Sequence, residues 1–342
     1  MRRAVAALAF VAMLGAAEAQ ATHITIGAVP STSAAATFLA LDKGYFRELG
    51  LDVEIEPVDS ASKVIPLLAT GHLQVVEGGI SVGYFNALLQ DLPIVLALER
   101  GSSPTSDAIL VRNDVAGAIR IVADLAGRPV ALVAPGTMPV YETGKVLARA
   151  GLTLKDIDVR YMPFPAMGAA LANKAVDAVY EIPPFGDMIL EQSLAKPWLV
   201  PDEMVQPAPV STTGYLANTD WVAQNRGLAR RIFVALLRAA REYCQAYHHG
   251  PNRAEVIDAM ARHGLVKDRA LLERTPWQAR NVDGRFNLAS LMDFQAFFVH
   301  EHVLDRMAPA ERLVDASFAD DAVKELGRFA LANTASTLAG CR

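Results

Sequence analysis

Short apolar runs alternate with segments of helical periodicity between residues 24 and 98. The apolar runs have the length and composition of strands, and the periodic segments end at glycine or at turn residues. Strands separated by helices of this length predict a parallel sheet with helices on its faces. The pattern predicts strands over 24–29, 51–56, 73–76 and 94–98, and helices over 34–47, 61–70 and 81–90.

A second unit of the same kind follows, with a strand over 129–134 and a helix over 139–150. Residues 68–76 (LATGHLQVV) and 171–179 (LANKAVDAV) align without gaps from a helix end into a strand. We therefore predict two similar α/β lobes. Long helices dominate beyond this unit and are expected to pack on the first lobe; they are predicted over 226–249, 252–263, 268–274, 288–306 and 319–332.

The order of these units predicts a chain that leaves the first lobe and returns to it. Lobe one is expected to comprise residues 20–112 and 215–342, and lobe two residues 113–214, with residues 211–215 in the hinge. A chain of this length is ample for two cores, because single cores rarely grow beyond about 250–300 residues.

The N-terminus has the three parts of a secretory signal. Arg2 and Arg3 precede an uncharged apolar run over residues 4–17, and Ala17-Glu18-Ala19 follows as a small-x-small cleavage pattern. The run is shorter than the roughly 20 residues that span a bilayer. We predict a signal peptide over residues 1–19 and a periplasmic protein; a buried N-terminal helix is the alternative.

The net charge is consistent with this prediction of an exported α/β protein. Removing residues 1–19 takes away two of the 32 basic and one of the 37 acidic side chains, which leaves a net charge of −6. Mild acidity without long charged blocks argues against binding to nucleic acid or to an anionic membrane.

The reactive side chains indicate neither a metal site nor a cofactor. The histidines are isolated or badly spaced for one metal ion, and no phosphate-binding or dinucleotide-binding glycine motif occurs. Cys244 lies on the apolar face of a predicted helix and is expected to be a buried free thiol. A disulfide to Cys341 is the alternative in an oxidising compartment.

Residues 39–53 (LALDKGYFRELGLDV) resemble the GYF…GL-x-V signature of the nitrate/sulfonate/taurine solute-binding proteins, which are similar in turn to the thiamine-pyrimidine synthase superfamily. Three further segments resemble parts of this family in the same order: residues 124–131, 170–183 and 314–318. One departure is Gln74, which stands where the first-lobe repeat of the family usually has an aspartate. The resemblance implies an α/β type II periplasmic-binding fold, two lobes that close on a ligand. It also implies a monomeric receptor that delivers a solute to an ABC permease and its ATPase.

Two alternatives share this fold. Some relatives are enzymes, either desulfinases with a cysteine nucleophile or pyrimidine synthases with a cysteine-rich iron motif. The other alternative is a sensory receptor that presents its ligand to a membrane kinase or to a tripartite permease. This chain has no cysteine in a predicted cleft loop. We therefore expect binding and not catalysis.

Ligands of open α/β sheets gather at the carboxyl ends of the strands, so the loops after each strand should line the cleft. Serine, threonine and glycine at helix starts favour an anionic ligand, although ordinary helix capping also selects them. Acidic residues in the same loops favour an amine or aminopyrimidine, and a zwitterion would suit both. The predicted ligand-binding residues are Ser31, Thr32, Ser33, Glu77, Gly78, Ser81, Arg100, Ser102, Ser103, Gly136, Thr137, Met138, Tyr180, Glu181 and Tyr215.

Overall fold

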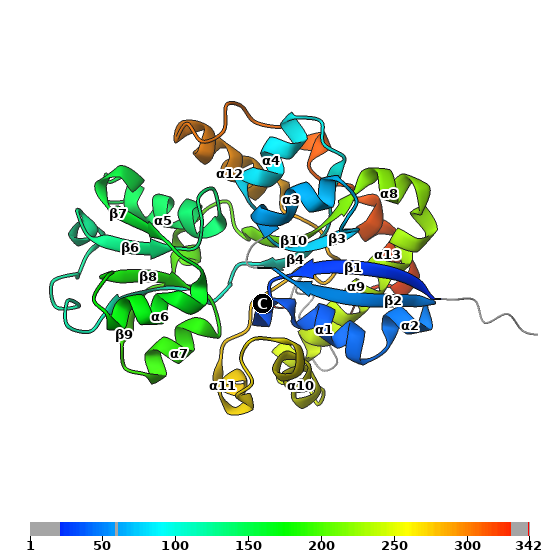
Figure 1. Ribbon diagram of the computed structural model, residues 1–342, viewed down its shortest axis with the longest axis horizontal. Helices are drawn as coiled ribbons and strands as arrows, with labels where there is room; N and C mark the ends of the chain where they lie inside the picture. The colour runs from blue at the N-terminus through cyan, green and yellow to red at the C-terminus, as the bar shows by residue number, and fades with distance from the viewer. Residues whose placement is uncertain (1–20, 59–60, 330–340, 342) are drawn as a thin grey trace, which may run out of the picture.

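A computed structural model describes residues 21–58, 61–329 and 341. The predicted signal peptide lies outside the described residues. Two α/β lobes stand side by side, each built on its own five-stranded sheet, and two chain segments connect them (Figure 1).

The first sheet has the strand order β2-β1-β3-β10-β4. Its first three strands are parallel, whereas β10 runs antiparallel to both β3 and β4. Helices cover both faces, with α3, α4 and α12 on one side and α1, α9 and α10 on the other (Figure 1). The strands are β1 (Thr22–Ala28), β2 (Leu51–Pro57), β3 (Val75–Gly79), β4 (Ile94–Ser102) and β10 (Ser211–Asn218).

The second sheet repeats this arrangement in the order β7-β6-β8-β5-β9, again with an antiparallel fourth strand. The two sheets match strand for strand, which confirms the predicted internal repeat. The strands are β5 (Ala108–Arg112), β6 (Pro129–Leu132), β7 (Asp158–Tyr161), β8 (Ala178–Glu181) and β9 (Ala195–Leu199); the helices of this lobe are α5 (Met138–Ala148), α6 (Phe164–Ala172) and α7 (Phe185–Glu191).

The antiparallel strands correct two predictions. Each sheet is mixed and not purely parallel, and residues 211–215 begin a central strand instead of serving as the hinge. The predicted lobe boundaries also shift, because β5 pairs entirely within the second sheet and β10 entirely within the first. The crossings between the sheets therefore lie within residues 103–107 and 200–210.

The helices of the first lobe largely follow the predicted series. One difference is that the predicted helix over 34–47 divides at Gly44, whose φ of 73° is left-handed. The helices are α1 (Ala35–Asp42), α2 (Tyr45–Glu48), α3 (Ala61–Ala69), α4 (Val82–Leu89), α8 (Thr219–Gln224), α9 (Arg226–Tyr247), α10 (Arg253–His263), α11 (Arg269–Arg274), α12 (Leu288–His300) and α13 (Ser317–Leu326). In the two lobes and the segments that connect them, single 3-10 turns span Thr32–Ala34, Val122–Leu125, Leu154–Asp156, Pro201–Met204 and Ala310–Arg312.

The disulfide is a further correction. Cys244 on the buried face of α9 is bonded to Cys341, with 5.2 Å between their Cα atoms. The amide of Cys341 donates to the carbonyl of Arg280 at 3.0 Å, so Cys341 is attached to the first lobe by a hydrogen bond as well as by the disulfide. This tertiary pairing, across 97 residues, has no local signature, so the sequence favoured a free thiol.

Helix α12 contacts both lobes, although it was expected to pack on the first alone. Phe294 packs against Phe85 of α4 and against Tyr141 of α5, at ring-centre distances of 5.5 and 5.1 Å. Asp293 accepts a hydrogen bond from Lys145 of α5 at 2.8 Å. One hydrophobic core therefore continues from α4 through α12 into the second lobe.

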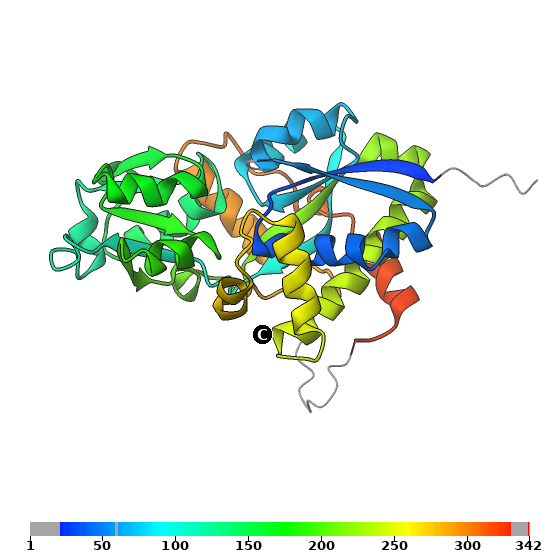
Figure 2. The same ribbon diagram turned by 60° about the horizontal axis from the view of Figure 1, so that its bottom comes forward.

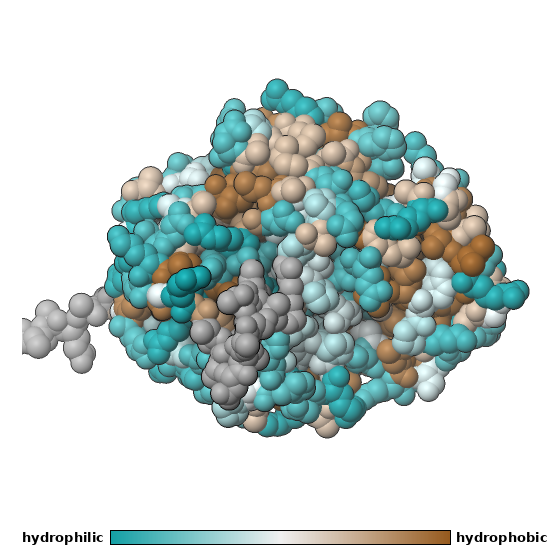
Figure 3. Space-filling model, turned by 180° about the vertical axis from the view of Figure 1, so that it is seen from behind, coloured by the Kyte–Doolittle hydropathy of each residue, from teal (hydrophilic) through white to brown (hydrophobic). Residues whose placement is uncertain are grey.

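On the face seen from behind, apolar residues form small patches separated by polar ones (Figure 3). Among the described helices, none combines the length and the apolar character needed to cross a membrane.

Candidate ligand pocket between the lobes

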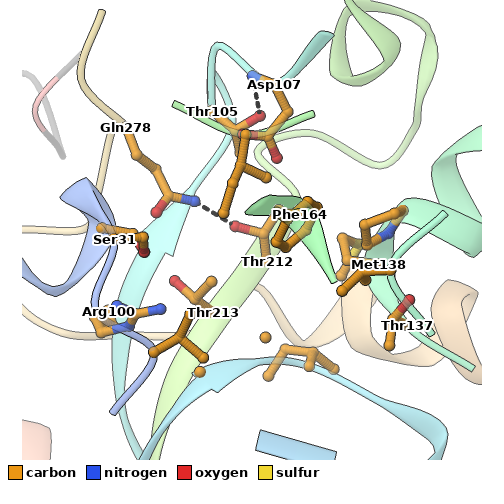
Figure 4. A pocket seen from close by; sticks show the side chains of 18 of the residues that line it. Ser31, Arg100, Thr105, Asp107, Thr137, Met138, Phe164, Thr212, Thr213 and Gln278 are labelled. Atoms are coloured by element: carbon orange, nitrogen blue, oxygen red, sulfur yellow. Dashed lines mark hydrogen bonds between the residues drawn. The ribbon is translucent and has the colours of Figure 1, made fainter. Parts of the chain in front are cut away.

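A pocket of about 810 Å³, including its open mouth, lies between the two lobes. This is within the range of small-molecule sites. Its walls come from the segments after β1, β3, β4 and β8, from the start of β10, from the first turn of α5 and from the crossing between β4 and β5 (Figure 4). The predicted position at strand ends is therefore the position of the pocket.

Eight of the fifteen predicted residues line this pocket. The two lobes meet where the start of α4 touches the start of α5: Ser81 and Thr137 form an isolated β-bridge, and the amide of Val82 donates to the carbonyl of Gly136 at 2.8 Å. Hydroxyl groups dominate this part of the wall. The eight lining residues are Ser31, Thr32, Ser33, Gly78, Ser81, Arg100, Thr137 and Met138.

The other seven predicted residues lie behind the wall. Ser102 is paired within the sheet, and Ser103 Oγ accepts a hydrogen bond from the amide of Val210 at the crossing between lobes. The side chains of Glu77, Tyr180 and Tyr215 likewise contact other side chains of the protein. The seven are Glu77, Ser102, Ser103, Gly136, Tyr180, Glu181 and Tyr215.

Arg100 is the buried cation of the lobe-one wall. It is only 3% exposed, and its Nε and Nη1 have no hydrogen-bond partner among the described residues. Its nearest carboxylate oxygen is Glu77 Oε1, at 4.0 Å from Nη1, which exceeds hydrogen-bond length. Unpaired N–H groups of a buried guanidinium cost free energy unless a ligand accepts them.

Glu77 is held beneath Arg100 by the protein's own hydroxyl groups. Thr37 Oγ1 donates to Glu77 Oε2 and lies 2.8 Å from the hydroxyl of Tyr215. Burial raises the pKa of the Glu77 carboxyl, while Arg100 and the Thr37 hydrogen bond lower it. Glu77 therefore neutralises Arg100 only in part.

Asp107 provides an acidic group on the opposite side, in the crossing between β4 and β5. Its amide donates to Thr105 Oγ1 at 3.2 Å, and its Oδ2 lies 3.0 Å from the hydroxyl of Tyr180. Burial raises the pKa of Asp107 to about 7, and nearby Asp202 adds to the effect.

The Tyr180 hydroxyl also contacts Oε2 of the fully buried Glu142. One hydroxyl proton can be donated to only one of the two carboxyls, so a proton on the other carboxyl would allow both contacts to be hydrogen bonds. Burial raises the pKa of Glu142 well above its ordinary value, and the neighbouring Asp107 contributes. In the part of the chain described, no three His, Cys, Asp or Glu side chains are grouped so that they could hold a metal ion.

The sequence prediction omitted several lining residues. Thr105 and Asp107 belong to the crossing between lobes, just beyond the loop that was predicted. Gln278 enters from the C-terminal half, where its Nε2 donates to Thr212 Oγ1 at 2.7 Å (Figure 4). No strand end or helix start marks Gln278 in the sequence. The other omitted residues are Val29, Gly79, Ile80, Val133, Pro139, Phe164, Ile182, Pro183, Thr212 and Thr213.

Comparison with known proteins gives one family match. A family model described as "NMT1/THI5 like" matches residues 31–248. No curated protein sequence matches the chain.

Solved structures share the fold at low sequence identity. The periplasmic nitrate-binding protein NrtA from Synechocystis PCC 6803 is 16% identical, with a TM-score of 0.73 over 93% of both chains. The alkanesulfonate-binding protein SsuA from Xanthomonas axonopodis pv. citri, bound to MOPS, is 18% identical, with a TM-score of 0.67 over 88% of this chain and 98% of that one. The desulfurization enzyme DSZB is 16% identical, with a TM-score of 0.60 over 89% and 99%. These likenesses confirm the predicted two-lobed periplasmic-binding fold.

Proposed function

Because the chain belongs to the NMT1/THI5-like family, we propose that it is the extracytoplasmic solute-binding receptor of an ABC importer and binds a small acidic organic solute between its lobes. The fold supports this proposal, since the solved structures of this shape include binding proteins for nitrate and for alkanesulfonates. The export signal predicted in residues 1–19 supports an extracytoplasmic location.

The proposal that the solute is acidic rests on Arg100. The Arg100 guanidinium lines the pocket, is 3% exposed and has no hydrogen-bond partner for Nε and Nη1 among the described residues, so an anionic group of a solute would compensate its charge. Sulfonate and carboxylate oxygens match the planar donor geometry of arginine. The hydroxyls of Ser31, Ser33 and Thr213 on the same wall could complete the hydrogen bonds of such a group.

Binding would be coupled to closure of the lobes. Thr32 Oγ1 donates to the carbonyl of Pro183 at 3.0 Å, and Thr275 Oγ1 donates to Asp187 Oδ2 at 2.9 Å, so hydrogen bonds join the lobes around the pocket. A solute that contacts both walls would stabilise this closed form relative to an open one. The closed receptor would then dock on its permease.

A binding screen tests this function. We expect one or more members of a library of alkanesulfonates, carboxylates, amino acids and pyrimidines to raise the melting temperature of the purified protein. Arg100→Gln should weaken binding of the identified acid by at least about tenfold, because a charged hydrogen bond is worth about 1.5–3 kcal/mol. Arg160→Gln, which alters an exposed arginine of β7, is the matched control. If no acid binds, or if Arg100→Gln binds it equally well, the proposed function is wrong.

The similarity to DSZB supports a second candidate, sulfinate hydrolysis. A structure of that enzyme in complex with biphenyl-2-sulfinic acid provides the test compound. Both cysteines of this chain are joined in a disulfide, and neither lines the pocket, so a cysteine nucleophile is not available there. We expect no sulfite release from biphenyl-2-sulfinic acid; release that Arg100→Gln abolishes would favour the enzyme instead.

A further inference from the structure

The two walls of the pocket carry opposite charges, and this narrows the class of solute. We infer that the pocket selects a solute with an anionic group at one end and a protonated nitrogen at the other, and that Asp107 binds the nitrogen. This inference rests on the proposed function, and it deepens that function by naming a specificity-determining residue.

The acidic wall lacks positive charge of its own. Four carboxyls lie close enough to interact electrostatically, and none of them forms an ion pair with a Lys, Arg or His of the described residues. Buried carboxylates need a cation or a proton to offset their lost hydration. The four are Asp107, Glu142, Glu181 and Asp202.

Asp107 is the member of this group that reaches the pocket. The protein fixes its orientation: Tyr180 contacts Oδ2, and Thr105 accepts its amide hydrogen. Thr105 is fixed in turn by Asp202, whose Oδ2 accepts hydrogen bonds from both the amide and the hydroxyl of Thr105. Asp107 lines the pocket, and among the described residues the hydroxyls of Tyr180 and Thr105 are the side-chain groups that hydrogen-bond its carboxyl, so no cation of the protein competes with a ligand donor.

In the close-up of the pocket, Asp107 lies at the top and Arg100 at the lower left, with the side chains of Thr212 and Ser31 between them (Figure 4). Arg100 lacks acceptors, and the Asp107 wall lacks a cation. A zwitterion with separated charges would supply both at once, whereas a simple alkanesulfonate would leave the acidic wall uncompensated.

Matched pairs of compounds test the inference. The first member is an ω-amino sulfonate or ω-amino carboxylate with two, three or four carbons between its end groups, and the second carries a methyl group in place of the amine. Isothermal titration calorimetry gives the ratio of the two affinities for each pair. We expect the wild-type protein to prefer the amino compound of the best-fitting pair by about ten- to a hundredfold, the value of a charged hydrogen bond.

Asp107→Asn should remove this preference while the methyl compound still binds, which also shows that the variant is folded. Glu203→Gln alters an exposed carboxyl beside Asp202 and should keep the wild-type ratio. If the wild-type protein binds acids but no pair favours the amine, or if Asp107→Asn retains the preference, the inference is wrong and the receptor function stands. If no acid binds in this series or in the wider library, the proposed function fails with it.

Discussion

Tyr180 shows how single residues set the chemistry of the pocket. Its hydroxyl contacts both Asp107 and Glu142, and its one proton can satisfy only one carboxylate. A proton on the other carboxyl would complete both contacts, and a positively charged ligand group would compensate the pair in the same way.

The raised pKa of Asp107 predicts how the free energy of unfolding varies with pH. An aspartate titrates near 3.9 in an unfolded chain, whereas the pKa of Asp107 is about 7 in the folded protein. Between these values the folded state binds more protons than the unfolded state, so the contribution of Asp107 to stability falls as pH rises. The free energy of unfolding should fall through this group by at most about 1.4 kcal/mol per pH unit.

Burial also raises the pKa of the Glu142 and Glu181 carboxyls, so the effect of Asp107 is measured as a difference between two proteins. Chemical denaturation of the wild type and of Asp107→Asn at pH 5, 6 and 7 gives the contribution of Asp107 alone. The variant should gain stability relative to the wild type as pH rises. Equal slopes for the two proteins would show that Asp107 ionises normally.

The residues of the site were predictable where a local pattern marks them. Ser31, Ser81 and Thr137 stand at helix starts after strands, and each lines the pocket as expected. Asp107 and Gln278 were missed because tertiary packing alone brings them to the wall. Glu181 was predicted from its strand end but lies behind the wall.

At the scale of elements, α12 is the helix that most changes the expected arrangement. It joins α4 and α5 through Phe294 and pairs with Lys145 through Asp293, so it ties the lobes together beside the covalent crossings. The periodicity of residues 288–300 predicts a helix but cannot say which lobe its faces meet. In the structure, α12 packs against α4 of the first lobe and α5 of the second.

Gly144 tests the contact between α5 and α12. A Cβ atom at this position would lie 2.3 Å from Cζ of Phe297, so alanine would overfill the interface. Overpacking costs typically about 1–3 kcal/mol, against about 1 kcal/mol that alanine gains as a helix former. Gly144→Ala should therefore lower the free energy of unfolding by up to about 2 kcal/mol in denaturant titrations.

Two further variants separate the packing effect from other causes. Gly227→Ala on α9 introduces a Cβ with nothing within 4 Å and should be neutral or slightly stabilising. Adding Phe297→Leu to Gly144→Ala should restore part of the lost stability by making room. A fully stable Gly144→Ala protein would mean that α12 moves freely away from α5.

For the whole molecule, the contact between α11 of the first lobe and α7 of the second is where closure can be measured. In Figure 2 the pair α10–α11 comes forward where the two lobes meet. Thr275, just after α11, donates to Asp187 of α7, and Arg274 pairs with Glu191 of the same helix. These contacts join the first lobe to the second without any chain connection.

Thr275→Val removes one of these bonds at nearly constant shape. A hydrogen bond worth about 1 kcal/mol should be lost from the closed form alone, so solute affinity should fall about fivefold. Calorimetry measures the affinity, and small-angle scattering should show a larger radius of gyration without solute. Thr70→Val, whose hydroxyl bonds within its own turn, is the control. An unchanged affinity would mean that this contact also persists in the open form.

The sequence predicted the two lobes and most of their elements, because each βα unit carries its own periodicity. It did not reveal β10 as a central strand. Residues 211–218 begin with polar residues, and their partners β3 and β4 lie far away in the chain. Pairing of this kind leaves no local pattern.

The position of β10 has a consequence for how the protein folds. The second lobe is continuous from β5 to β9, so all its strands are available together. The first sheet cannot be completed until β10 enters between β3 and β4, after the whole second sheet has been synthesised. Pairing between distant segments is slow, because a long loop must close first. During synthesis, which releases the N-terminus first, the second lobe should therefore fold before the first lobe is complete.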